Sequence, residues 1–245
     1  TGTTTATRRL STTISTAIPI EKKKTAKILI IEKGKDLDKR ICPMKIKEIS
    51  CKTCPECALL SGWGGAGAFS DGKLNLSPEV GGFLSRYIDI EKLKSLINYV
   101  DEIYVKYGAP KEIYGGNSDE IRGIKKLTSK NNLHFIPSKI RHIGTDRCKA
   151  LLKKIKEDIN QKAETLFDSE AEKVIARKGK VIGIRLKDGR SLHSEYLILS
   201  PGREGSRWLE RESKRLHLTL YRNPVDIGLR VEVPASVFEP LTKIT

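Results

Sequence analysis

Residues 171–202, AEKVIARKGKVIGIRLKDGRSLHSEYLILSPG, carry the clearest strand pattern in the chain. Apolar and polar residues alternate through two segments, with turns predicted at residues 178–180 and at Asp188 and Gly189. The apolar run YLILS, residues 196–200, predicts one more strand, buried in a core. We therefore expect a β-meander followed by a buried strand.

A second strand signal is the continuous apolar run KILIIE, residues 27–32, which ends in an acid. Such a run is typical of a strand buried on both faces of a parallel sheet. Asp89 is placed to cap a helix that ends near Tyr107, and another helix is expected after Thr145, with Cys148 on its buried face. Strands, helices and a meander in this order predict an α/β nucleotide-binding fold.

The charge balance of the chain is strongly basic. Its 245 residues include 46 Lys and Arg against 30 Asp and Glu, a net charge of +16, and 38% of them are hydrophobic. This size and composition can bury a core, which excludes a disordered protein. The excess of cations implies an anionic partner, but they are scattered among acids. Only EKKKTAK, residues 21–27, is a local basic run, so nucleic-acid binding is not expected. No apolar run approaches the roughly 20 residues of a membrane span.

The two ends of the sequence carry little patterning. Residues 1–20 contain no acid, two Arg and many Thr and Ser. This composition predicts a flexible tail rather than an organelle transit peptide, because no amphipathic face is evident. The only methionine is Met44 and residues 237–245 add no closing element, so we expect a fragment or a processed product.

The block GWGGAGAFSDGKL, residues 62–74, partly fits two nucleotide-binding patterns and completes neither. Its G-x-G-x-x-G spacing follows a cysteine-rich segment instead of a strand, and Leu74 stands where a P-loop needs a hydroxyl. What remains is a loop that lets backbone N–H groups approach a ligand, with Ser70, Asp71 and Lys73 at its rim. A tight structural loop between sheet and helix is an equal alternative.

Glu32 ends the run KILIIE. At the end of a strand in a dinucleotide-binding fold, a carboxylate can accept hydrogen bonds from both ribose hydroxyls of an adenosine. Taken alone, an ordinary solvated acid is the better explanation of this residue.

The cysteines Cys42, Cys51, Cys54 and Cys57 follow the spacing C-x8-C-x2-C-x2-C. Two successive C-x2-C steps can direct several thiolates to one centre, as tetrahedral Zn²⁺ or an iron–sulfur cluster requires. A set of unligated thiols in a loop is the alternative, and the spacing does not choose the metal.

Several longer blocks resemble a known family. They are LIIEKGKDLDKRICP, CKTCPECALLSGWGGAGAFSDGKLNLSPEVGG, YVDEIYVKYGAP, IPSKIRHIGT, LSPGREGSRWLERESKRL and NPVDIGLRVEVP. Together, from about Ala26 to Thr242, they closely resemble FAD-dependent dehydrogenases of the glutathione-reductase-like flavoprotein group. The long GWGGAGAFSDGKL and PGREG blocks are far more specific than a short glycine pattern.

The resemblance implies a domain plan and a cofactor site. It implies an FAD-binding Rossmann-like domain at residues 25–81 and 140–218, with the meander as an insertion. A helical insertion at 82–139 and the start of a substrate or cap domain at 219–245 complete the plan, and residues 1–24 form a tail. The implied cofactor-binding residues are Glu32 and Lys33 at the ribose, Gly64, Gly65, Gly67, Ser70, Asp71 and Lys73 at the pyrophosphate and flavin, Ala171 at the adenine, and Gly202, Arg203 and Glu204 beside the cofactor.

The function implied is an FAD-dependent oxidoreductase that transfers hydride, with NAD(P)H or another electron donor, in the cytoplasm. His142 is the best acid–base candidate, although a polar surface or core histidine is the more ordinary assignment. The family's G-x-G-x-x-G before residues 27–32 is missing, and Ser61 stands where a cysteine is frequent. These departures support two alternatives: a non-enzymatic, basic, cysteine-ligated metal module that contacts nucleic acid, and a truncated reading frame that does not fold stably.

Overall fold

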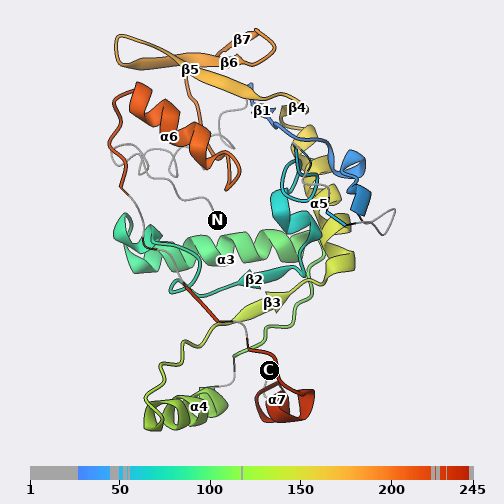
Figure 1. The fold of residues 1–245 in the computed structure, drawn as a ribbon, viewed down its shortest axis with the longest axis vertical. Helices are drawn as coiled ribbons and strands as arrows, with labels where there is room; N and C mark the ends of the chain where they lie inside the picture. Colours follow the sequence, from blue (N-terminus) through green and yellow to red (C-terminus); the bar gives the residue numbers. More distant parts are fainter. Residues whose placement is uncertain are drawn as a thin grey trace. The chain divides into compact units, whose positions relative to one another are not determined.

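The computed structural model describes residues 27–44, 50–51, 54, 56–116, 118–221, 224, 227–229 and 231–242. It is a mixed α/β protein with small sheets and several helices (Figure 1). Two compact units divide it: the first lies within Thr1–Gly72 and Thr145–Tyr221, and the second within Lys73–Gly144 and Arg222–Thr245. The tail predicted at residues 1–24 lies outside the described residues.

In the first unit, β1 (Leu29–Ile31) pairs in parallel with β4 (Glu164–Leu166). The strand predicted at residues 27–32 is thus confirmed, as is its parallel pairing. Its burial on both faces is wrong, because Leu29 is 40% exposed. A parallel strand is covered only when neighbouring strands and crossover helices lie on both sides of it, and in the described part of the chain β1 has one strand neighbour.

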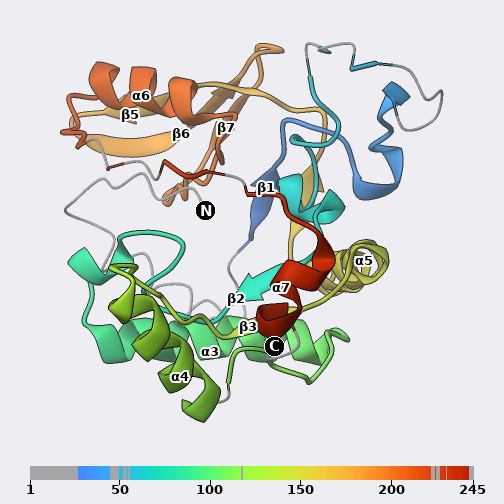
Figure 2. The ribbon, with the colours of Figure 1, turned by 60° about the horizontal axis from the view of Figure 1, so that its bottom comes forward.

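The predicted meander is confirmed as β5 (Ala171–Arg177), β6 (Lys180–Leu186) and β7 (Ser191–His193), an antiparallel sheet in that order. Helix α6 (Ser206–Arg215) packs against this sheet (Figures 1 and 2). The buried residues of this layer alternate along the strands, as a half-covered sheet requires. They are Val174, Ile184 and Leu186 on the strands and Leu209 on the helix.

The strand predicted at residues 196–200 is wrong. The structure assigns no strand there, and Tyr196 and Ile198 are 77% and 61% exposed. Ser194 forms a local turn instead, because its hydroxyl accepts from the Tyr196 N–H at 3.2 Å and also bonds the Tyr196 carbonyl. An apolar run needs a strand partner to become a strand, and among the described residues this run has none.

Helix α5 (Thr145–Asn160) confirms the helix predicted after Thr145. Cys148 is 4% exposed, so its assignment to the core is also correct. The helix packs on the short 3-10 helix η2 (Gly65–Phe69) of the glycine block. A second 3-10 helix, η1 (Leu37–Lys39), follows β1 and buries Leu37.

In the second unit, α3 (Ile90–Lys106) begins at the predicted cap, where the Asp89 side chain accepts from the Lys92 N–H at 2.8 Å. Strand β2 (Lys73–Asn75) pairs antiparallel with β3 (Ile140–His142). Three further helices complete the described part of this unit: η3 (Leu84–Arg86), α4 (Ser118–Lys130) and α7 (Ala235–Thr242).

Arg141 joins the pieces of the second unit. Its buried guanidinium donates two hydrogen bonds to Asp101 of α3, at 2.5 and 2.6 Å, and a third to the Pro110 carbonyl at 2.5 Å. The Asp101 hydrogen bonds raise the pKa of Arg141 despite its burial. A planar fork on a carboxylate is the strongest form of ion pair, and here it fixes β3 against α3.

Candidate functional site

The glycine block lies against the carboxyl end of β1. A Cβ added to Gly34 would stand 2.4 Å from the Gly62 nitrogen, so the two backbones meet without room for a side chain. The Trp63 N–H donates to the Lys35 carbonyl at 3.0 Å, which fixes this contact. The loop after β1 and the glycine block therefore form one continuous surface.

The buried Arg40 side chain holds the backbone of this surface in place through hydrogen bonds. It is 5% exposed and donates to the carbonyls of Ala58 at 2.9 Å and Trp63 at 2.6 Å. Its guanidinium also stacks 4.8 Å from the Phe69 ring centre. The second terminal nitrogen, Nη2, is buried without a hydrogen-bond partner among the described residues. Burial lowers the pKa of Arg40, opposed by the nearby Glu32 carboxylate.

Sequence reasoning missed Arg40, although it is the central side chain of the loop. It is one of 46 Lys and Arg residues, and no spacing or neighbour separates it from the solvated ones. Only the structure shows that the residue opposite Arg40 must be a glycine. A Cβ on Gly62 would lie 2.6 Å from the Arg40 Cδ.

Three predicted residues come together at the end of β1. Glu32 accepts the Gly34 N–H through Oε1 at 2.8 Å. Lys33 forms an ion pair with Glu204, Nζ to Oε1, at 3.0 Å, although 171 residues separate them in the sequence. Burial raises the pKa of Glu204, but hydrogen bonds from Ser61 and Lys33 outweigh it and leave this pKa below its ordinary value.

The carboxyl end of β4 closes the same region. The Ser169 N–H donates to the Glu32 carbonyl at 3.0 Å, and the Asp168 N–H donates to the Gly34 carbonyl at 3.1 Å. These bonds place the start of β5, with the predicted residue Ala171, two residues beyond the site. Three separate segments, the end of β1, the glycine block and the PGREG block, thus meet where two parallel strands end.

The glycines of these blocks fall into two groups. Gly64, at φ +80°, lies against α5, where an added Cβ would come within 2.6 Å of Leu152. Gly65, Gly67 and Gly202 face open space, because an added Cβ would meet nothing within 4 Å. A ligand can therefore approach these positions closely, although the Gly65 N–H itself already donates to the Gly62 carbonyl at 2.9 Å.

Three further predicted polar residues, Ser70, Asp71 and Arg203, lie in the glycine and PGREG blocks. The Ser70 hydroxyl bonds the Gly67 carbonyl at 2.9 Å and accepts the Gly72 N–H at 3.1 Å, so Ser70 braces the loop. Arg203 is exposed in the PGREG block, and Asp71 is also exposed.

Lys73 and the acid–base candidate His142 lie opposite each other, but as paired residues of β2 and β3 in the second unit. His142 is exposed on the surface of that unit. The two residues are close because the register of β2 and β3 places them opposite each other.

The four candidate metal ligands do not form a ready-made centre. Cys51 and Cys54 are exposed, and Cys42 and Cys57 are half-buried. Within the described ranges, no group of three or more His, Cys, Asp or Glu side chains is arranged to hold a metal ion. Zinc or an iron–sulfur cluster on these thiolates stays a prediction.

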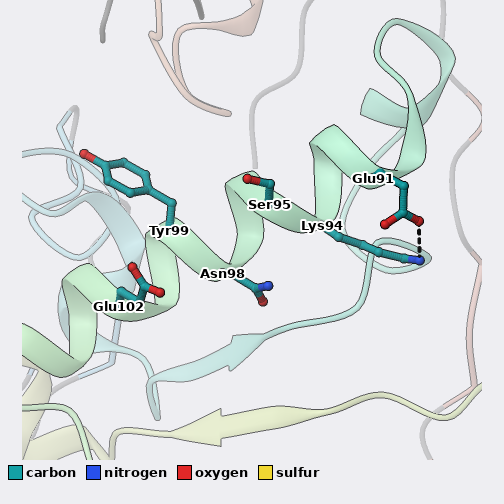
Figure 3. A pocket seen from close by; sticks show the side chains of 6 residues that line it. All are labelled: Glu91, Lys94, Ser95, Asn98, Tyr99 and Glu102. Atoms are coloured by element: carbon teal, nitrogen blue, oxygen red, sulfur yellow. Dashed lines mark hydrogen bonds and ion pairs between the residues drawn. The ribbon is translucent and has the colours of Figure 1, made fainter.

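A shallow hollow runs along α3 in the second unit (Figure 3). Every residue that lines it is exposed and comes from this one helix, and Lys94 pairs with Glu91 at 2.8 Å. None of the predicted site residues belongs to it, and it has no buried polar group. Its lining residues are Glu91, Lys94, Ser95, Asn98, Tyr99 and Glu102.

Comparison with known proteins finds a similar protein. No family model matches the chain. A protein of Clostridium beijerinckii described as uncharacterised is 30% identical over 216 residues, which cover 85% of this chain and 32% of that protein. The chain thus spans about a third of the length of the relative it matches. No helix among the described residues is long and apolar enough to cross a membrane.

Proposed function

We propose that the protein is an FAD-dependent oxidoreductase whose first unit is the Rossmann-like, cofactor-binding part. The observation that carries this proposal is the meeting of Glu32, the open glycines and the PGREG block at the carboxyl ends of β1 and β4. In open α/β sheets, ligands bind outside the carboxyl ends of parallel strands.

The residues present suit a dinucleotide. Glu32 uses one carboxylate oxygen for Gly34, and no described residue bonds the other, which can accept a ribose hydroxyl. Gly65 and Gly67 leave open space beside the loop, so a phosphate can approach its backbone closely. The Lys33–Glu204 ion pair holds the PGREG block, and with it Gly202, beside these groups.

When bound, FAD would supply hydride chemistry that side chains lack. The chain's own residues bind and orient it. The chain matches about a third of its longer relative. The substrate and the electron donor, NAD(P)H or another, therefore stay expectations. A cytoplasmic location is a further expectation of the proposal.

The test is direct FAD titration, followed by quenching of flavin fluorescence, together with an absorption spectrum of the protein as purified. Glu32→Ala should weaken FAD binding by about tenfold, the value of a good hydrogen bond to a charged group. Glu79→Ala is the matched control, because it removes an exposed acid from the second unit. A wild-type protein that takes up no FAD would overturn the proposal, as would equal FAD affinity in both variants.

A further inference from the structure

The far end of the β5–β6 hairpin concentrates positive charge in an arrangement that weakens the fold. Arg177 lies directly opposite Lys180 in the strand register, with Lys178 on the turn between them. Like charges at directly opposite positions destabilise an antiparallel pair. No described residue forms an ion pair with any of these cations.

The residue at the first turn position is also unfavourable for stability. Lys178 and Gly179 have φ angles of +50° and +73°, the left-handed pair of a type I′ hairpin turn. Asn or Asp before glycine is the favoured sequence there, since both tolerate positive φ. A lysine at this position adds charge where backbone preference calls for asparagine.

The charge continues along the open face of the sheet. Lys173 pairs in register with Arg185, and both are exposed next to the buried pair of Val174 and Ile184. Side chains alternate between faces, so these two cations lie on the face opposite the buried pair. Arg177, four residues beyond Lys173 on the same strand, shares this face.

The other residues of the open face also suit a charged partner better than an apolar one. His193 of β7 lies opposite Gly183 in its centre. Glu172 partly neutralises the face, through its 3.0 Å pair with Arg185. His193 is the one aromatic residue in the three strands, so the surface offers several cations to phosphates but little area for stacking bases.

We propose that this basic hairpin surface, formed by Lys173, Arg177, Lys178, Lys180 and Arg185, binds the phosphate backbone of a nucleic acid without sequence preference. A polyanion on the surface would neutralise the two like-charged pairs. Lys173 lies two residues from Ala171 of the proposed FAD site, but the hairpin end, residues 177–180, contains none of that site's residues, and the proposal does not depend on FAD binding.

The test is fluorescence anisotropy with a labelled 20-nucleotide oligouridine over a series of salt concentrations. The hairpin variant is Arg177→Gln, Lys178→Asn, Lys180→Gln. Its matched control is Lys125→Gln, Lys126→Gln, Lys130→Gln on α4, three exposed lysines whose loss changes the net charge equally. Wild type should bind oligouridine and oligoadenosine alike. The hairpin variant should bind about tenfold more weakly, and its log–log salt slope should be shallower by about 2, from three phosphate contacts at about 0.7 each.

A second measurement separates binding from folding. The hairpin variant should melt at a higher temperature than wild type, because it removes like-charge repulsion and introduces an Asn–Gly turn. Weaker RNA binding by a more stable protein is a result that misfolding does not produce. Equal loss of binding in the hairpin and α4 variants would assign the effect to net charge alone and overturn the proposal. So would binding to vesicles of anionic phospholipid with no binding to either oligonucleotide.

Discussion

The contact between α6 and the outer edge of β5 carries a stability prediction for Glu212. This residue is 6% exposed, accepts the Val174 N–H at 2.8 Å and pairs with Arg215 at 2.6 Å. Arg215 donates in turn to the Val174 carbonyl, also at 2.6 Å. Two side chains thus make the bonds to β5 that a neighbouring strand would otherwise make.

Glu212→Ala should lower the free energy of unfolding by about 2–3 kcal/mol. Without the carboxylate the buried Val174 N–H has no acceptor, which costs about 1–3 kcal/mol. Breaking a fully buried ion pair costs about 3–5 kcal/mol. The Arg215 side chain is 44% exposed and regains water, so the smaller figure applies.

Urea denaturation of matched variants measures this loss. Glu212→Gln keeps an acceptor for Val174 and should cost about 1 kcal/mol, the difference between a charged and a neutral hydrogen bond. Glu210→Ala, on the exposed side of the same helix, removes an acid that pairs with Lys214 at the surface and should change stability by about 0.5 kcal/mol or less. A Glu212→Ala loss as small as that of Glu210→Ala would refute the reasoning.

The same contact predicts a pH dependence. Hydrogen bonding from Arg215 outweighs burial and holds the pKa of Glu212 below its ordinary value. Because the folded pKa is lower than the unfolded one, about 4.3 for glutamate, ionised Glu212 contributes its full stability above the unfolded pKa. That contribution is lost as the pH falls through the folded pKa. The stability difference between wild type and Glu212→Gln should therefore be constant near neutral pH and shrink in acid.

Two further predictions concern the second unit and the cysteines. Arg141→Lys keeps the charge but loses the two-point contact with Asp101, and should cost about 2–3 kcal/mol in urea denaturation; a loss below about 0.5 kcal/mol would show that charge alone suffices. Metal analysis tests the cysteine site: the double variant Cys54→Ser, Cys57→Ser should lose any zinc or iron that copurifies with wild type, and metal retained by it would exclude these thiols as ligands.

The elements that sequence patterns predicted are those with local causes. The helix after Asp89 has a cap, an apolar face and a glycine stop, all within 20 or so residues of each other, and it forms as expected. The meander has turn residues at both of its turns, and its strands follow. Cys148 lies at a helical spacing that needs no knowledge of its partner, and it is buried.

The failures and omissions have tertiary causes. The run at residues 196–200 has a good strand composition, but composition does not supply the neighbouring strand that its backbone requires. Arg40, Arg141 and Glu212 each bond groups at least 18 residues away, and a charged residue in sequence looks the same whether it is solvated or buried. Local patterns therefore predicted the elements but not the ionic contacts that hold them together.

The conformation of the glycine block has a local cause, its glycines, and a tertiary cause, the buried Arg40. The charge of Arg40 favours an anionic ligand at this loop. Arg40 bonds only carbonyl oxygens in the described part of the chain, so no direct ion pair cancels its charge. Burial lowers its pKa, but a guanidinium stays charged at neutral pH. The accessible backbone of Gly65 and Gly67 lies in the loop that this charge supports. A fixed cation that supports an accessible loop favours phosphate more than a neutral ligand, and for this reason FAD uptake should weaken in Arg40→Leu at least as much as in Glu32→Ala.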